Sequence, residues 1–144
     1  MDKINPQGGP FLTPLKQIFH PQGDVYHAMK ASDIGFTGFG EAYFTTVHRG
    51  ETKGWKQHTR MQMNLIVTVG AVRFYVHDVA TGMTTQYVLG PQNYVRLTVP
   101  PGYWMAFSGL DHELNMVCNL ASIEHDPAEA VNVPLATYPL ESAV

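Results

Sequence analysis

The feature that most constrains the fold of this 144-residue chain is a long alternation of apolar and polar side chains between residues 56 and 69. Apolar residues occupy every second position from Met61 to Val69. The polar set that alternates with them is Lys56, His58, Arg60, Gln62 and Asn64. Successive side chains of a strand point to opposite faces, so this period predicts one strand over 56–69 with a polar face and an apolar face.

Further short runs of β-branched and aromatic residues are separated by glycine and proline turns. They predict strands over residues 42–47, 72–78, 83–89, 94–99, 103–107 and 113–120. Weak helical signals occur only within residues 23–36 and at Asp126, where Pro127 follows a residue suited to a helix N-cap. Closely spaced short strands with turn residues between them are typical of a β-sandwich or β-barrel. We therefore expect an all-β domain.

Composition and charge exclude several kinds of protein and several kinds of partner. Charged residues make up 15% of the chain, against roughly 25% in an ordinary soluble domain, and the net charge is −3. This excludes a coiled coil and a disordered chain. No run of Lys and Arg marks a nucleic-acid or membrane partner, and no apolar stretch approaches the ~20 residues of a membrane span. The single Cys118 excludes an intrachain disulfide framework, and we expect a cytoplasmic protein.

The polar face of the 56–69 segment has two interpretations. In most antiparallel sheets such a face is exposed to solvent, and this is the commoner case. Alternatively, it lines a solvated cavity or binds anions. Three of the nine Lys and Arg residues, namely Lys53, Lys56 and Arg60, surround His58 within eight residues. This concentration in a chain with few charges favours the second interpretation.

Two glycine-containing motifs resemble those of the cupin superfamily. The first consists of Gly50, Lys56, His58, Gln62 and Gly70 in the order and spacing of the first cupin motif. The second, Pro100, Gly102 and Met105, resembles the second cupin motif, with Met105 where a histidine normally stands. The resemblance implies a double-stranded β-helix, a small jelly-roll barrel with its site inside. From the length we expect one domain over residues 1–144, a cupin domain by this resemblance, and the proline and glycine residues of 1–14 predict an extended arm there.

The residues at the cupin metal-ligand positions are poorly suited to a divalent metal. These positions correspond to Lys56, His58, Gln62 or Met63, and Met105. Only His58 is a good ligand for iron, manganese or zinc, because lysine is a cation at neutral pH and methionine favours soft metals. We expect no catalytic metal and no other cofactor.

Among cupins, the chain most resembles the metal-free dTDP-4-dehydrorhamnose 3,5-epimerase family. Three stretches carry this resemblance, at residues 53–58, 99–107 and 125–129. It implies an enzyme of deoxysugar or surface-polysaccharide biosynthesis that removes a proton next to the keto group of a nucleotide-linked 4-keto-6-deoxyhexose. It also implies a homodimer formed by sheet exchange through the N-terminal strands.

The resemblance assigns roles to individual residues. His58 is the expected base, although Lys56 is an alternative match to the family histidine, and Lys56 or Arg60 is expected to stabilise the enolate or bind diphosphate. Further candidates for substrate binding are Gln62, Trp55, Arg73, Arg96, Tyr94, Tyr103 and Trp104. The family's tyrosine acid falls near Cys118 or Asn119, where this chain has no tyrosine. A second hypothesis is therefore a cupin that binds a carbohydrate or a nucleotide sugar without catalysis.

Overall fold

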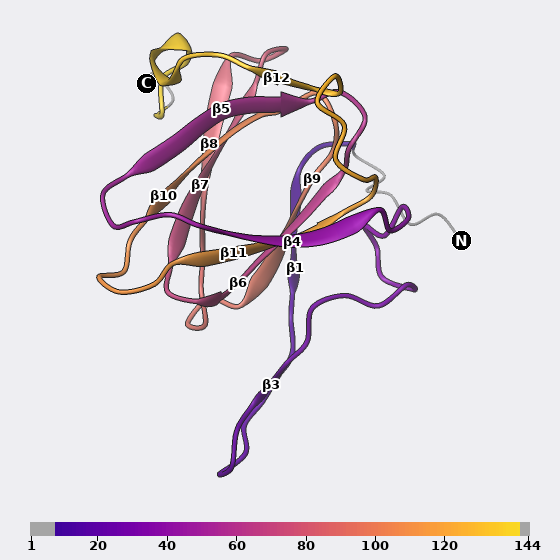
Figure 1. The fold of residues 1–144 in the computed structure, drawn as a ribbon, viewed down its shortest axis with the longest axis vertical. Helices are drawn as coiled ribbons and strands as arrows, with labels where there is room; N and C mark the ends of the chain where they lie inside the picture. Colours follow the sequence, from indigo (N-terminus) through magenta and orange to yellow (C-terminus); the bar gives the residue numbers. More distant parts are fainter. Residues whose placement is uncertain (1–7, 142–144) are drawn as a thin grey trace.

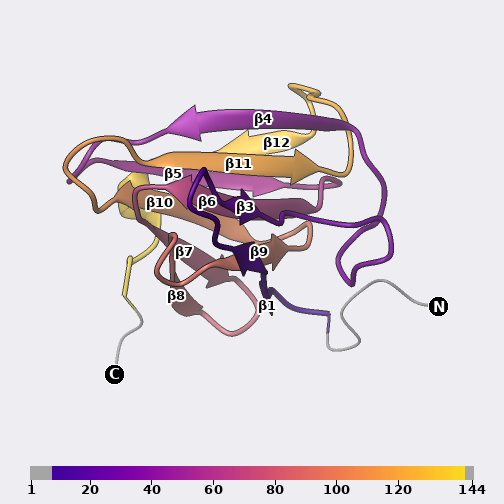
Figure 2. The same cartoon turned by 90° about the horizontal axis from the view of Figure 1, so that it is seen from below.

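A computed structural model describes residues 8–141, which form two facing five-stranded antiparallel sheets (Figures 1 and 2). The first sheet has the order β1 (Phe11–Pro14), β9 (Val95–Val99), β6 (Met63–Val69), β11 (Met116–Ala121) and β4 (Glu41–Thr46). The second has the order β12 (Ala130–Asn132), β5 (Thr52–His58), β10 (Trp104–Gly109), β7 (Val72–Asp78) and β8 (Met83–Leu89). The all-β jelly roll expected from the motifs is confirmed.

The apolar positions of the alternating strands meet between the two sheets. From the first sheet the core contains Leu65, Val67, Leu97, Val99 and Val117, and from the second Val72, Phe74, Val76 and Leu89. All of these side chains are at most 3% exposed. Burial of such side chains stabilises the fold by about 1.5–3 kcal/mol each, before the entropy of ordering the chain is subtracted.

The prediction of one strand over residues 56–69 is wrong. β5 ends at His58 and β6 begins at Met63, and the chain passes from one sheet to the other between them. The backbone N–H groups of Arg60 and Met61 donate to the carboxylate of Glu129 at 2.9 Å each. In a continuous strand these groups would pair with the backbone of a neighbouring strand, and here a side chain accepts them instead. Because the chain changes sheets here, the polar set no longer shares one face.

The N-terminal region differs from the arm predicted over residues 1–14. Residues 1–7 lie outside the described part of the chain, and Phe11–Pro14 pair with β9 as a strand of the first sheet. The projecting element is instead the hairpin of β2 (Gln17–Ile18) and β3 (Val25–Tyr26), which extends from the body in Figure 1. No helix forms over 23–36 or at Asp126, where a turn closes with a hydrogen bond from Glu129 N–H to Asp126 O at 3.0 Å.

Residues 129–140, which we term the C-terminal strap, run along β5 and then cover the outer face of the second sheet. β12 pairs with β5, and the 3₁₀ turn η1 (Leu135–Thr137) follows. Beneath the strap lies a second apolar cluster of Trp55, Tyr75, Trp104 and Ala106, packed against Val133, Leu135, Tyr138 and Leu140 of the strap. Residues 8–141 contain no helix long and apolar enough to cross a membrane.

Candidate active site

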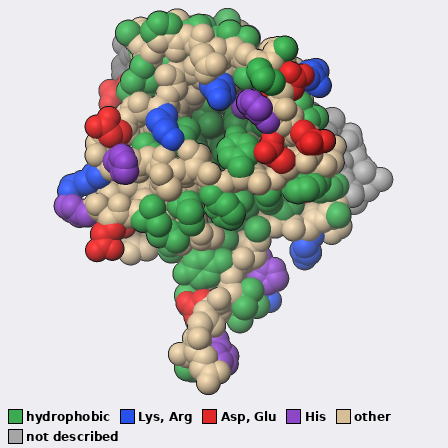
Figure 3. Space-filling model, viewed as in Figure 1, with side chains coloured by type: hydrophobic (Ala, Val, Ile, Leu, Met, Phe, Trp, Pro, Cys, Tyr) green, Lys and Arg blue, Asp and Glu red, His purple; other side chains and the backbone are tan. Residues whose placement is uncertain are grey.

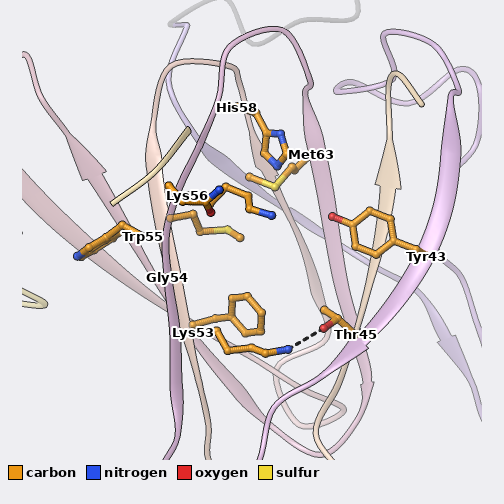
Figure 4. A pocket seen from close by; sticks show the side chains of 11 residues that line it. Tyr43, Thr45, Lys53, Gly54, Trp55, Lys56, His58 and Met63 are labelled. Carbon is orange, nitrogen blue, oxygen red and sulfur yellow. Dashed lines mark hydrogen bonds between the residues drawn. The ribbon is translucent and has the colours of Figure 1, made fainter. Parts of the chain in front are cut away.

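A pocket of about 360 Å³ opens between β4, at the edge of the first sheet, and β5 of the second. Its walls come from both sheets and from the strap, through Tyr43, Thr45, Lys53, Lys56, His58, Met63, Met105, Phe107 and Asn132. In Figure 3 the molecule is hollowed here, with hydrophobic side chains at the bottom and basic and histidine side chains around the rim. Figure 4 shows the lining residues at close range.

An irregularity in β5 turns both lysines toward this pocket. Lys56 pairs with Met105 and Lys53 with Phe107, so Gly54 and Trp55 together lie opposite Ala106 alone. Such a bulge shifts the alternation of side chains by one position. Gly54 has φ +150°, and a Cβ atom there would lie 2.5 Å from the Cβ of Ala106. Only glycine fits this close approach, and the bulge directs the ring of Trp55 away from the pocket (Figure 4).

His58 is held by a buried carboxylate. Its Nδ1 lies 2.7 Å from Oε1 of Glu129, and the two residues are 7% and 2% exposed. The other carboxylate oxygen accepts the two backbone N–H groups of Arg60 and Met61. Burial alone would raise the pKa of Glu129, but these hydrogen bonds outweigh it and lower the pKa to about 2. The ionised carboxylate only accepts, so Nδ1 of His58 carries a proton, and in the neutral imidazole the lone pair is therefore on Nε2.

The two lysines differ in their surroundings. Lys53 donates to Thr45 Oγ1 at 3.0 Å and to Thr46 O at 2.8 Å, bridging β5 and β4 (Figure 4). The ammonium group of Lys56 has neither a hydrogen bond nor an ion pair within residues 8–141, and the side chain reaches across the pocket near His58 (Figure 4). Lys56 is therefore available to neutralise negative charge on a bound molecule.

A tyrosine that the sequence motifs did not indicate lies on the opposite wall of the pocket. Tyr43 lies on β4 directly opposite Asn119 of β11, whose Nδ2 donates to the tyrosine oxygen at 3.0 Å. Its hydroxyl group points into the pocket (Figure 4). The family tyrosine was expected near Asn119, and the structure has a tyrosine at the paired position of the neighbouring strand. Only the strand register reveals this, because the two residues are 76 positions apart.

The sequence also missed the role of Glu129. The stretch 125–129 was matched to the family, but no contact between its glutamate and His58 was predicted. The contact joins residues 71 positions apart and depends on β12 pairing with β5.

Of the predicted site residues, His58 and Lys56 lie together in the pocket. Arg60 instead forms an exposed ion pair with Asp126 at 2.9 Å, and buried Gln62 donates to Gly35 O at 2.6 Å. Both point elsewhere because the strand ends at His58. Met63, expected on the face opposite His58, lines the same pocket.

The other predicted binding residues lie outside this pocket, apart from Trp55, which borders it while its ring packs beneath the strap. The indole of Trp55 donates to Leu135 O at 2.9 Å, and Trp104 belongs to the same cluster. The hydroxyl of Tyr94 donates to His27 O at 2.8 Å. Neither Arg73 of β7 nor Tyr103 lines the pocket.

Arg96 has a structural role, because its side chain contacts residues of the N-terminal part of the chain. It is fully buried on β9, between the inward-facing Val95 and Leu97 positions of the strand, and burial lowers its pKa. Its guanidinium donates to Ala28 O at 2.6 Å and to Ile34 O at 3.2 Å. Through these hydrogen bonds Arg96 holds residues 28–34, which precede β4, against the first sheet.

The pocket brings the four cupin ligand positions together, but their chemistry does not fit a divalent metal. Lys56, His58, Met63 and Met105 all line it. A cation and two thioethers leave one suitable donor, and in residues 8–141 no three His, Cys, Asp or Glu side chains gather closely enough to hold an ion. That the protein uses no metal remains a prediction.

Neither protein-family models nor the sequences of curated proteins match this chain. Among solved structures, a dTDP sugar isomerase from Desulfovibrio desulfuricans is 31% identical, with a TM-score of 0.85, and the alignment covers 90% of this chain and 86% of that one. The chain belongs to the dTDP-sugar isomerase family. The family predicted from the motifs is thus confirmed, and with it an enzyme of the sugar-nucleotide epimerase and isomerase class.

Two more distant members of this structural group share the fold. NovW, a 4-keto-6-deoxy sugar epimerase from Streptomyces spheroides, is 19% identical with a TM-score of 0.81, covering 94% of this chain and 73% of NovW. QdtA, a sugar 3,4-ketoisomerase from Thermoanaerobacterium thermosaccharolyticum, is 21% identical with a TM-score of 0.74, covering 85% and 87%. Both an epimerase and a ketoisomerase therefore have this fold.

Proposed function

We propose that this protein epimerises or isomerises a dTDP-linked 4-keto-6-deoxyhexose by proton transfer at a carbon next to the keto group. The observation that carries the proposal is the buried His58–Glu129 pair. It borders a pocket containing the ammonium group of Lys56, which has no partner in the described part of the chain. Family membership supplies the substrate class, because the relatives are named for dTDP sugars and 4-keto-6-deoxy sugars.

The first step is removal of a carbon-bound proton by Nε2 of His58. Glu129 holds the ring with Nδ1 protonated and stabilises the imidazolium ion that forms. The electrons of the broken C–H bond form a carbon–carbon double bond, and the carbonyl electrons move to oxygen. The ammonium group of Lys56 stabilises this enolate oxygen in a pocket whose walls include Met63, Met105 and Phe107.

The second step returns a proton to the enolate. Tyr43 lies on the wall opposite β5, and its hydroxyl donates a proton to the other face of the sugar. The hydrogen bond from Asn119 stabilises the phenolate that remains. Transfer from the opposite face inverts the carbon and gives an epimer. Return of the proton by His58 to the former carbonyl carbon, with transfer of the adjacent hydroxyl proton to the enolate oxygen, would instead move the keto group. The opposed positions of Tyr43 and His58 favour epimerisation.

The test is incubation of the protein with dTDP-4-keto-6-deoxyglucose in deuterated water, followed by NMR of the sugar. We expect deuterium at C3 or C5, and loss of exchange in His58→Ala. His125→Ala, which alters an exposed histidine outside the pocket, is the matched control and should exchange normally. Tight binding of the sugar nucleotide by wild type without any exchange would replace this proposal with a binding cupin.

Two further parts of the proposal concern assembly and location. We propose a homodimer in which the β2–β3 hairpin contacts a second copy, since Ile18, Phe19 and Val25 are 40%, 73% and 50% exposed on it. A monomer by light scattering would contradict the dimer. We also propose a cytoplasmic location, which suits the one unpaired thiol of Cys118.

A further inference from the structure

The C-terminal strap supplies one residue that lines the pocket and one that holds the histidine of the pocket. Its first residue is Glu129, which holds His58, and Asn132 lines the pocket three positions later. The backbone of the strap is hydrogen-bonded along β5, from Thr59 N–H to Glu129 O at 3.0 Å and from Trp55 N–H to Val133 O at 3.2 Å. The position of Glu129 therefore depends on how firmly the strap is attached to β5.

Pairing with β5 alone is a weak attachment. β12 has three residues and lies at the edge of the second sheet, so it has one neighbouring strand. Short edge strands have few hydrogen bonds and open readily. Val131 and Asn132 are both exposed, so burial of the strand itself adds little.

The firm attachment lies beyond β12, at Tyr138. Its ring stacks on the ring of His77 with centroids 4.2 Å apart at 23°, and meets Trp55 edge-on at 5.9 Å and 82°. The next residue, Pro139, accepts a hydrogen bond at 3.0 Å from Thr84 Oγ1, which also contacts His77 Nδ1 at 2.9 Å. Each aromatic pair is worth about 0.5–1.5 kcal/mol beyond its buried area.

Trp55 connects this anchor to the catalytic strand. It is fully buried, and its indole donates to Leu135 O of the strap. Along β5, Trp55 is followed directly by Lys56, and His58 lies two positions further, both with side chains in the pocket. The anchor thus acts on β5 and on the strap together, the two elements that carry His58 and Glu129.

We propose that Tyr138 is a positioning residue for the catalytic base, which acts through the strap by keeping the Glu129 carboxylate on Nδ1 of His58. Tyr138 does not line the pocket and contacts no group assigned to proton transfer. When a distant substitution misplaces the reacting groups by about 1 Å, turnover falls by up to about 100-fold. The kinetic part of this inference rests on the proposed function.

The direct test observes the proton shared by His58 and Glu129, and it does not depend on activity. In proton NMR a short, buried hydrogen bond of this kind places the Nδ1 proton far downfield of the amide region, and its loss in His58→Gln assigns it. We expect Tyr138→Ala to broaden or remove this signal while the protein stays folded. Tyr138→Phe, which keeps the ring, should retain the signal.

A matched control separates positioning from general stability. Val72→Ala removes core volume at the end of β7 remote from His77, in a residue that is fully buried and outside the pocket. It should lower the unfolding midpoint yet retain the downfield proton. If Tyr138→Ala retains the proton, or if Val72→Ala loses it equally, the inference is wrong.

Kinetics supply the second measurement. We expect Tyr138→Ala to lower kcat by about 10- to 100-fold with KM changed less than about threefold, and Tyr138→Phe to restore kcat. A wild-type protein without turnover would refute the proposed function and leave the NMR result standing. Wild-type turnover combined with a normal kcat in folded Tyr138→Ala would refute the positioning role alone.

Discussion

Replacing Glu129 with glutamine tests the site most directly, because the change is isosteric and removes only charge and one acceptor. The carboxylate accepts three hydrogen bonds, one from His58 and two from the backbone N–H groups of Arg60 and Met61. A glutamine oxygen placed to keep the two backbone bonds turns its amide NH₂ toward Nδ1 of His58. Since that NH₂ only donates, Nδ1 must become the acceptor and the proton moves to Nε2. The base then lacks its lone pair on the pocket side.

The expected loss of activity is large. A wrong imidazole tautomer in an otherwise intact histidine–carboxylate pair lowers kcat by about 10⁴-fold in the serine-protease precedent. We expect a fall of about 10³- to 10⁴-fold in Glu129→Gln, with little change in the affinity for thymidine diphosphate. Isotope exchange at the sugar should fall in parallel with kcat, because both require the same proton abstraction.

The same substitution has a stability consequence that depends on pH. The pKa of Glu129 is about 2 in the folded protein, against 4.5 for an ordinary glutamate. A lowered carboxyl pKa stabilises the folded state above the unfolded value and loses this contribution as pH falls through the folded value. At 1.36 kcal/mol per unit, the contribution is about 3 kcal/mol at neutral pH, of which about 2 kcal/mol is lost by pH 3. Glu129→Gln removes this part of the pH dependence.

Urea unfolding at pH 6 and pH 3, with kcat measured at neutral pH, checks both parts. Wild type should lose about 2 kcal/mol more than Glu129→Gln between the two pH values. Equal losses in the two proteins would show that Glu129 is not the stabilising carboxylate. A folded Glu129→Gln with kcat within threefold of wild type would refute the assigned tautomer and the role of His58 as base.

Three other substitutions have defined outcomes. Tyr43→Phe should lower formation of the epimer by about 100-fold or more while His58 still exchanges the substrate proton with solvent; equal loss of exchange and product would contradict a role as acid. Gly54→Ala places a Cβ atom 2.5 Å from that of Ala106, so we expect a loss of about 2 kcal/mol or more in urea unfolding, and an unchanged midpoint would refute the tight bulge. Arg96→Met leaves the carbonyl groups that precede β4 without their donor and should cost about 1–3 kcal/mol, whereas a more stable variant would show that desolvation of the guanidinium outweighs its hydrogen bonds.

The sequence predicted the fold well where alternation alone decides it. The strands near residues 42–47, 72–78 and 83–89 have nearly the expected bounds, because turn residues separate them from the neighbouring elements. The predicted strand over 56–69 failed because a carboxylate 69 residues away from Arg60 takes up the backbone donors that a continuous strand would pair. A pattern of local periodicity contains no information about that partner.

The candidate site was predicted only in part for the same reason. His58 and Lys56 were identified because they are close in sequence and match a motif. Tyr43 lies on β4 and Glu129 directly precedes β12, both remote in sequence from His58. The registers of β4 with β11 and of β12 with β5 bring them to the site. Arg96 was predicted to bind an anion because arginine commonly does so. The sequence does not show that its guanidinium donates to backbone carbonyl groups instead.

Because it requires the contact between His58 and Glu129, the active site should form late in folding. The two residues close a loop of 71 positions, and β12 must join an already formed β5 before they meet. Contacts between distant residues form slowly, because the entropy of closing the loop is lost before the contact stabilises the chain. During refolding, the barrel should therefore recover its sheet signal before catalytic activity returns, and the delay between the two would measure the time that β12 and the strap take to dock.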